Sequence, residues 1–127
     1  MLPQFLIPES TLRANGVSSP LLLGESRGRM LQLTLSIRRA LEQESVEISI
    51  EGSSDGENWL EKPLAHFPQK FYCGDYVILC DLAAHPEISH LRATWKLNRW
   101  GRGDLTPMFD VFLFVELAKQ MVASAAG

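Results

Sequence analysis

Three segments of the chain alternate strictly between hydrophobic and polar residues. In residues 31–37 every second side chain is leucine or isoleucine, and the same period of two runs through residues 46–51 and 91–98. This period places successive side chains on opposite faces of a β-strand, so each segment is predicted to be a strand with one buried face. Strands of parallel sheets are usually covered on both faces. The pattern therefore predicts antiparallel sheets.

A fourth strong strand is predicted at residues 109–117. Its second face also carries two large apolar side chains, Phe112 and Phe114, and something must cover these rings. The apolar N-terminal segment, residues 1–8, has no partner in the alternation. We expect it to form an arm that packs on the two rings, in the same chain or in a neighbouring copy. The candidate residues of an oligomer interface are Phe5, Leu6, Phe112 and Phe114.

Weaker strand signals lie between these segments and are bounded by glycine, asparagine and aspartate residues that suit tight turns. They cover residues 11–14, 20–23, 59–64 and 76–82. Good helix formers gather only in residues 117–124, and the C-terminal tail, residues 118–127, ends in small residues. The sequence predicts an all-β protein, an antiparallel jelly-roll β-sandwich of about eight strands with little or no helix. Residues 1–127 are expected to form one domain.

Composition and charge argue against several classes of protein. The 127 residues are 46% hydrophobic and 21% charged, which is typical of a globular domain. The net charge of −3 argues against a nucleic-acid partner, because such domains carry basic surfaces. No apolar stretch is long enough to span a membrane, and residues 1–8 are too short and uncharged for a signal peptide, although one removed from a precursor is compatible with the sequence. These features favour the cytoplasm or a virion.

The two cysteines, Cys73 and Cys80, flank a Gly74-Asp75 pair that can turn a hairpin. A two-residue turn there places Cys73 opposite Tyr76 and not opposite Cys80. A disulfide between the cysteines needs a different loop geometry. Free thiols are therefore expected, and they favour a reducing compartment.

Residues 47–59 contain an alternating strand followed by Ser53, Asp55, Gly56 and Trp59 in the spacing Ser-x-Asp-Gly-x-x-Trp. This segment resembles the strand and turn of galactose-binding-like jelly rolls of the discoidin type. Residues 88–95 and 112–117 resemble later strands of that family, so the resemblance covers about residues 46–117. The terminal cysteine pair of discoidin domains is absent. The resemblance implies a domain that binds sugars, lipids or proteins through loops at one end of the sandwich, or a structural module of a larger assembly such as a phage virion.

Signatures of catalysis are mostly missing from the sequence. There is no His-Glu-x-x-His or Cys-x-x-Cys motif. The histidines His66, His85 and His90 are scattered, and His85 and His90 lie on opposite faces of an extended chain. The aspartates of the predicted turns, such as Asp55 and Asp104, are expected to cap those turns rather than to bind calcium. We therefore expect no enzyme, no metal and no cofactor, and a small hydrolase ranks last.

The most distinctive surface feature is the loop of residues 98–107, where a tryptophan stands between arginines and an aspartate. An exposed tryptophan beside charged hydrogen-bonding groups suits a sugar ring or a protein partner. The alternative is that Trp100 closes one end of the sandwich and its neighbours only solvate the turn. The candidate ligand-binding residues are Arg99, Trp100, Arg102 and Asp104.

A second polar surface is expected where the basic face of residues 92–96 lies beside the acidic face of residues 47–51. Cross-strand ion pairs are expected to neutralise it. Taken together, the sequence predicts a non-catalytic binding or assembly module with a protein partner or self-association. The alternative is a carbohydrate-binding module that uses residues 98–107.

Overall fold

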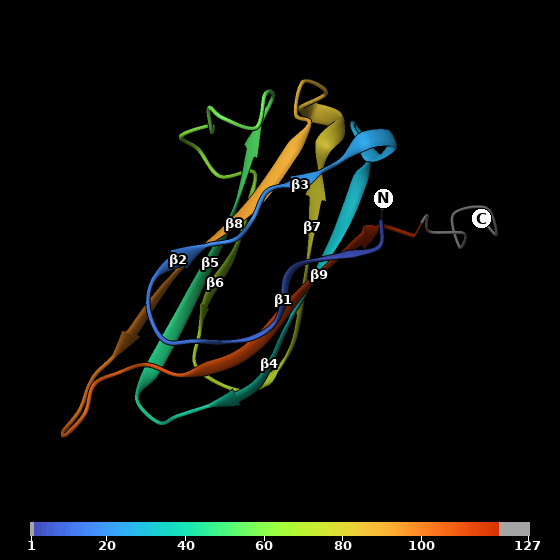
Figure 1. Ribbon diagram of the computed structural model, residues 1–127. Helices are drawn as coiled ribbons and strands as arrows, with labels where there is room; N and C mark the ends of the chain where they lie inside the picture. Colours follow the sequence, from blue (N-terminus) through green and yellow to red (C-terminus); the bar gives the residue numbers. More distant parts are fainter. Residues whose placement is uncertain (1, 120–127) are drawn as a thin grey trace.

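The structure is a computed structural model that describes residues 2–119. Two antiparallel sheets pack face to face, as Figure 1 shows, and the predicted all-β sandwich is confirmed. The strands are β1 (Gln4–Leu12), β2 (Gly16–Val17), β3 (Leu21–Leu22), β4 (Met30–Ala40), β5 (Glu44–Ser53), β6 (Ala65–Lys70), β7 (Gly74–Asp81), β8 (His90–Arg99) and β9 (Phe109–Leu117). Helical structure in residues 2–119 is limited to two short 3₁₀ turns, Gly24–Ser26 and Leu82–Ala84.

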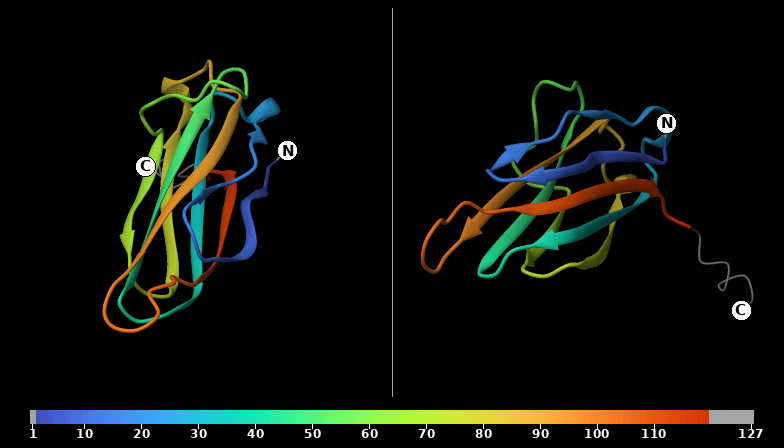
Figure 2. Two further views of the ribbon diagram at one scale, coloured as in Figure 1. Left: turned by 60° about the vertical axis from the view of Figure 1, so that its left-hand side comes forward. Right: turned by 60° about the horizontal axis from the view of Figure 1, so that its bottom comes forward.

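The strand order differs strongly from the order along the chain. One sheet has four strands in the order β1-β9-β4-β7, and the other has the order β2-β8-β5-β6, with β3 also paired to β8. Only the connections β2–β3 and β5–β6 stay within one sheet, and the remaining connections pass from one sheet to the other. Loops therefore gather at the two ends of the sandwich, where Figure 2 shows them from two sides.

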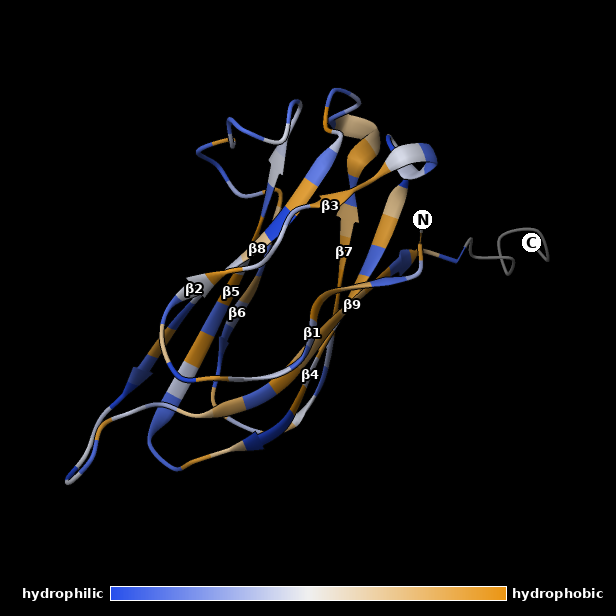
Figure 3. Ribbon diagram, in the orientation of Figure 1, coloured by the Kyte–Doolittle hydropathy of each residue, from blue (hydrophilic) through white to orange (hydrophobic). Residues whose placement is uncertain are grey.

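The predicted alternation builds the core. Leu31, Leu33, Leu35 and Ile37 of β4 are almost completely buried, and the apolar residues of β5 face them from the other sheet. Figure 3 shows the alternation of hydrophobic and hydrophilic positions along these strands. Each buried side chain contributes roughly 1.5–3 kcal/mol through removal of its apolar surface from water. The interior between the sheets therefore stabilises the fold.

The apolar N-terminal segment is part of strand β1. It pairs with β9 antiparallel, with Phe5 opposite Phe114 and Leu12 opposite Phe109. Two register shifts interrupt this ladder. The sequence alternation is lost at these shifts, which explains why residues 1–8 showed no strand pattern.

One strand prediction and one turn prediction were wrong. Residues 59–64 form a loop with a single bridge between Ser53 and Trp59, and the strand lies later, in β6. The Gly74-Asp75 pair does not turn a hairpin, because β6 and β7 belong to different sheets and Gly74 already pairs with Ile37 of β4. The cysteines are unbonded: Cys73 is exposed in the connection and Cys80 is buried in β7.

The predicted helix formers of residues 117–124 fall partly outside the described residues. Leu117 is the last residue of β9, and residues 118–119 follow it without regular structure. The tail from residue 120 onward lies outside the described range. Among residues 2–119, no helix has the length and hydrophobicity needed to cross a lipid bilayer.

Candidate binding surfaces

The loop of residues 98–107 projects beyond the rest of the sandwich at one end (Figure 1). Two of its four candidate residues hold the loop in shape. Arg99 Nη1 donates a hydrogen bond to the Thr106 carbonyl oxygen at 3.0 Å. The Asp104 carboxylate accepts from the Thr106 backbone N–H at 2.9 Å and from its hydroxyl at 2.7 Å, and these bonds lower the pKa of Asp104. Arg102 is exposed near the tip of the loop.

The fourth candidate, Trp100, belongs to a cluster of exposed aromatic side chains. Its ring centroid lies 6.2 Å from that of Phe71, and the two rings are nearly perpendicular at 81°. Phe71 also lies 6.2 Å from Tyr72, which is 77% exposed. We call Phe71, Tyr72 and Trp100 the aromatic end. Phe71 and Tyr72 were not predicted as part of a binding surface. The available signal was a pair of adjacent aromatic residues close to Gly74.

A groove of about 500 Å³ runs beside the aromatic end. Its other wall is the turn between β4 and β5, where Glu42 and Gln43 are exposed. Trp100 is held to this turn because its backbone N–H donates to the Gln43 carbonyl oxygen at 2.9 Å. The groove thus combines flat apolar rings with a carboxylate and an amide.

A buried carboxylate fixes this end of the molecule. Glu44 is only 1% exposed, and its two carboxylate oxygens accept separate backbone hydrogen bonds, from Leu41 N–H at 2.6 Å and from Met108 N–H at 2.9 Å. The first bond closes the turn between β4 and β5, and the second holds the end of the loop before β9. Glu44 therefore joins the turn between β4 and β5 to the connection that carries Trp100, a role that was not predicted from the sequence.

The outer face of the four-stranded sheet carries the two phenylalanines that needed a cover. The Phe5 ring centroid lies 5.5 Å from Phe112 in an edge-on arrangement and 5.1 Å from Phe114. The cover is thus supplied by the same chain, but Phe5 itself remains 50% exposed. Leu6 points the other way and is buried in the core. Of the four candidate interface residues, three lie on the outer face.

Apolar side chains recur at the opposite edge of the sheet, beyond the polar residues of β4. Phe5, Phe114, Thr34 and Val77 lie opposite one another on four adjacent strands. Val77 and Leu79 on β7 are 55% and 57% exposed. We call this surface the outer apolar face. It comprises Phe5, Val77, Leu79, Phe112 and Phe114.

The outer face of β5 and β8 in the five-stranded sheet is polar, as predicted. Arg92 Nε lies 2.7 Å from the Glu51 carboxylate, and the Arg92 guanidinium stacks 4.3 Å from the centroid of the Trp59 ring. Glu47 and Lys96 stand opposite each other on the same strands. Exposed pairs of this kind contribute about 0–1 kcal/mol each, but they keep this face hydrated. The two outer faces therefore differ in chemistry.

The Ser-x-Asp-Gly-x-x-Trp segment lies at the end of the sandwich remote from the loop of residues 98–107, because it follows the other end of β5 (Figure 1). The Asp55 carboxylate accepts from the backbone N–H groups of Asn58 and Glu57, each at 2.8 Å, and from the side chains of Asn58 and Ser53. These bonds hold the pKa of Asp55 well below its usual range. Asp55 therefore caps its turn, as the sequence suggested.

Within residues 2–119, no group of three or more histidine, cysteine or acidic side chains is arranged to hold a metal ion. Burial raises the pKa of the Cys80 thiol to about 11, assisted by the nearby Asp81 carboxylate, so this thiol stays protonated at neutral pH.

The comparisons with known proteins give no assignment. No family model matches the chain, and no curated protein shows significant sequence similarity to it.

Proposed function

We propose that the protein is a non-catalytic assembly module whose outer apolar face packs against a second copy of the chain. The observation that carries this proposal is the contrast between the two sheets. Five large apolar side chains lie on the outer face of one sheet. On the other sheet the Arg92–Glu51 ion pair and polar residues cover the central strands β5 and β8, and the exposed Val17 and Leu22 lie at one edge. Large exposed apolar patches are typical of protein interfaces.

A second copy fits because the outer apolar face is complementary to itself. The aromatic strip on β1 and β9 and the aliphatic strip on β7 flank the small polar residues of β4, such as Thr34. A two-fold axis parallel to β4 places the aromatic strip of each copy on the aliphatic strip of the other. Such an isologous contact buries both strips at once.

Sedimentation over a wide range of protein concentrations tests this proposal. The parent protein is expected to form a dimer at micromolar concentration, and the double variant Val77→Lys and Leu79→Lys to sediment as a monomer. Both residues are exposed, so the variant should fold. Val17→Lys is the matched control, because Val17 is 51% exposed on β2 of the other sheet. A monomeric parent, or equal weakening by the control, contradicts the proposal.

The resemblance to discoidin-type jelly rolls supports a role in a larger assembly, including a virion. The order of strands favours this resemblance, because connections that pass repeatedly between two sheets are a feature of jelly rolls.

A second candidate function is carbohydrate binding, favoured by the aromatic end. A sugar ring can stack on Trp100 or Tyr72, while its hydroxyl groups bond to Glu42 and Gln43. Arg99 and Asp104 are engaged within their loop, so they support the site rather than contact the sugar.

A glycan array followed by titration of a positive sugar tests this candidate. Trp100→Ala is expected to weaken binding at least about ten-fold, since stacking and hydrogen bonding are both lost. Trp59→Ala is the control, because Trp59 pairs with Ser53 at the other end of β5 and its replacement should leave the affinity unchanged. An array without any signal, or a Trp100→Ala variant that binds as well as the parent, removes this function.

A further inference from the structure

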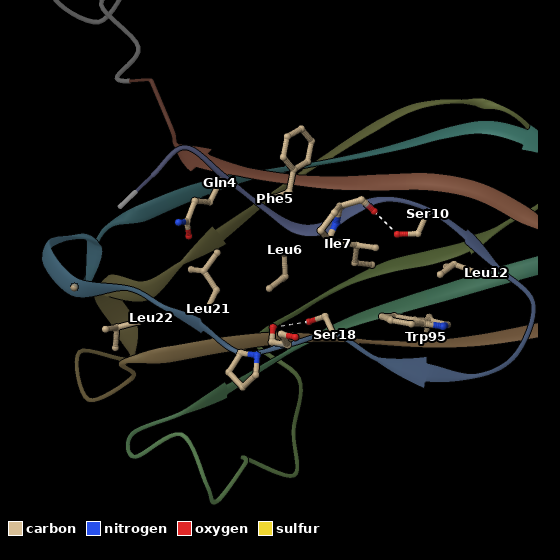
Figure 4. Close-up of a pocket in the computed structure, with 14 residues that line it drawn as sticks. Gln4, Phe5, Leu6, Ile7, Ser10, Leu12, Ser18, Leu21, Leu22 and Trp95 are labelled. Atoms are coloured by element: carbon tan, nitrogen blue, oxygen red, sulfur yellow. Dashed lines mark hydrogen bonds between the residues drawn. The ribbon is translucent and has the colours of Figure 1, made fainter.

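A deep cleft opens along one side of the sandwich, between β1 of one sheet and the β2–β3 segment of the other (Figure 4). These strands are end strands of their sheets and do not pair with each other, so the space between them is not closed by a backbone ladder. The volume of about 830 Å³ falls within the usual range of small-molecule sites. We call it the open-edge cleft. It is lined by residues 4–8, Ser10, Leu12, residues 18–22, Gly24 and Trp95.

The interior of the cleft is apolar. Leu6, Leu12 and Leu21 point into it from both walls, as Figure 4 shows, and each belongs to the hydrophobic core. Trp95 forms one end, and its indole N–H is already bonded to the Ala14 carbonyl oxygen at 3.0 Å. The indole therefore offers an incoming molecule mainly its apolar ring surface.

The charge of the lining residues determines which polar group a bound molecule can carry. None of the residues that line the cleft is acidic or basic, and the polar groups are the hydroxyls of Ser10, Ser18 and Ser19 and the amide of Gln4. A carboxylate or ammonium group in the cleft would lose hydration without gaining a counter-ion. The Ser10 and Ser18 hydroxyls already donate to the carbonyl oxygens of Pro8 and Ser19, but a hydroxyl or an ester can instead bond to the Ser19 hydroxyl or the Gln4 amide. The lining is therefore complementary to an uncharged molecule.

The backbone of the cleft argues against an added β-strand as its occupant. The ladder of β1 has two register shifts, and Pro8 offers no N–H on this edge strand. On the other wall, the N–H groups of Ser18 and Leu23 already donate to Ala93 and Ser89. Irregular strands of this kind are protected against edge pairing.

We propose that the open-edge cleft binds an uncharged aliphatic molecule, an alkyl chain with a neutral hydroxyl or ester head. The chain lies among the leucines, and the head reaches the serines at the rim. The site is separate from the contact that we propose on the outer apolar face, although Phe5 belongs to both surfaces.

Titration with 1-decanol, with decanoate as the charged comparison, tests this inference by methyl and indole NMR. We expect saturable shifts at the methyl groups of Leu6, Leu12 and Leu21 and at the Trp95 indole. Decanoate should bind at least about ten-fold more weakly, because its carboxylate finds no counter-ion. The shifts should persist in the Val77→Lys and Leu79→Lys variant, which separates this test from that of the dimer.

Two variants sharpen the test. Leu21→Trp fills the cleft and should abolish decanol binding, whereas Leu79→Trp on the outer face is the matched control. Leu21 is buried, so the exposed rim variant Ser19→Lys decides the outcome if Leu21→Trp fails to fold. Ser19→Lys should strengthen decanoate binding relative to decanol, because it supplies the missing cation. Absence of saturable shifts, equal binding of both probes, or shifts confined to Phe112 and Phe114 overturns the inference.

Discussion

At the scale of single residues, Glu44 shows how a carboxylate can be buried without a cation. Its two oxygens accept two backbone N–H groups from segments far apart in the sequence, at Leu41 and Met108. Hydrogen bonds to a charged acceptor are stronger than those between neutral groups, and they compensate for the loss of hydration. The side chain therefore acts as a structural link behind the groove of the aromatic end.

Replacement of Glu44 by glutamine should destabilise the protein. The amide has only one oxygen, so one buried backbone N–H loses its acceptor and faces an NH₂ group instead. We expect a loss of about 2 kcal/mol in the free energy of unfolding, measured by urea denaturation. The control is Glu42→Gln, an exposed change in the same turn that should have no measurable effect. Equal stabilities of the two variants would refute the role of Glu44.

The buried thiol of Cys80 gives the folded protein a defined response to alkaline pH. The ordinary pKa is 9.0, and burial raises it to about 11 in the folded state. The unfolded chain therefore releases this proton first, so the stability linked to the thiol is present below pH 9 and is lost as the pH rises toward 11. The unfolding free energy of the parent should fall more steeply over this range than that of Cys80→Ala. Parallel pH profiles would show that burial of Cys80 has no such effect.

At the scale of elements, β5 contains a glycine that the packing of the core requires. A Cβ atom at Gly52 would lie 2.5 Å from the Leu64 side chain and 3.1 Å from that of Ile88. Both neighbours belong to or pack against the core, and the strand pairs on this side with Leu91 of β8. The absence of a side chain at Gly52 therefore lets the loop residues close over this end of the sandwich.

Gly52→Ala should destabilise the protein by about 1–3 kcal/mol, because the extra methyl group forces Leu64 and Ile88 out of their positions. Thermal and urea unfolding measure this loss. Ser49→Ala on the same strand is the control, since Ser49 makes no side-chain hydrogen bond within the described residues. A stable Gly52→Ala variant with unshifted Leu64 and Ile88 resonances would show that the site has spare volume.

The sequence predicted the strands that bury one face and leave the other face polar. β4, β5, β8 and β9 lie where the alternation placed them, because a regular ladder keeps alternate side chains on opposite sides. β1 was missed because its register shifts bring both Leu6 and Ile7 into the core. β6 was missed because Pro68 interrupts its pattern and Phe67 is its only fully buried residue. Irregular edge strands are therefore not recognised from a strict alternation of apolar and polar residues.

The candidate surfaces were predicted only in part, for a related reason. Trp100 was identified from its own loop, but its partners Phe71 and Tyr72 come from another connection, and only the fold brings the two loops together. Glu44 could not be distinguished in the sequence from other polar residues at strand ends, because its contact with Met108 depends on the fold. The open-edge cleft exists because two end strands remain unpaired, and no local pattern reports such a gap.

At the scale of the whole molecule, charge should oppose the proposed dimer. Each copy carries a net charge of −3, and Glu116 lies beside the outer apolar face, opposite Gln32. Two copies in contact therefore repel each other electrostatically. Added salt shortens the range of this repulsion, so the dimer should become tighter as NaCl rises from about 20 to 300 mM. Sedimentation of the parent and of Glu116→Gln measures the effect, and the variant should depend less on salt. A dimer that weakens with salt would indicate an attractive ionic contact instead.

The position of β9 between β1 and β4 has a consequence for folding during synthesis on the ribosome. β9, the last strand within the described residues, occupies the middle of its sheet, so β1 and β4 are synthesised before the strand that pairs with both of them. Pairing between strands that are far apart in the sequence slows folding. Until β9 is synthesised, the edges of β1 and β4 that pair with it remain exposed and prone to aggregation. Nascent chains halted before Phe109 should therefore be held by chaperones or degraded.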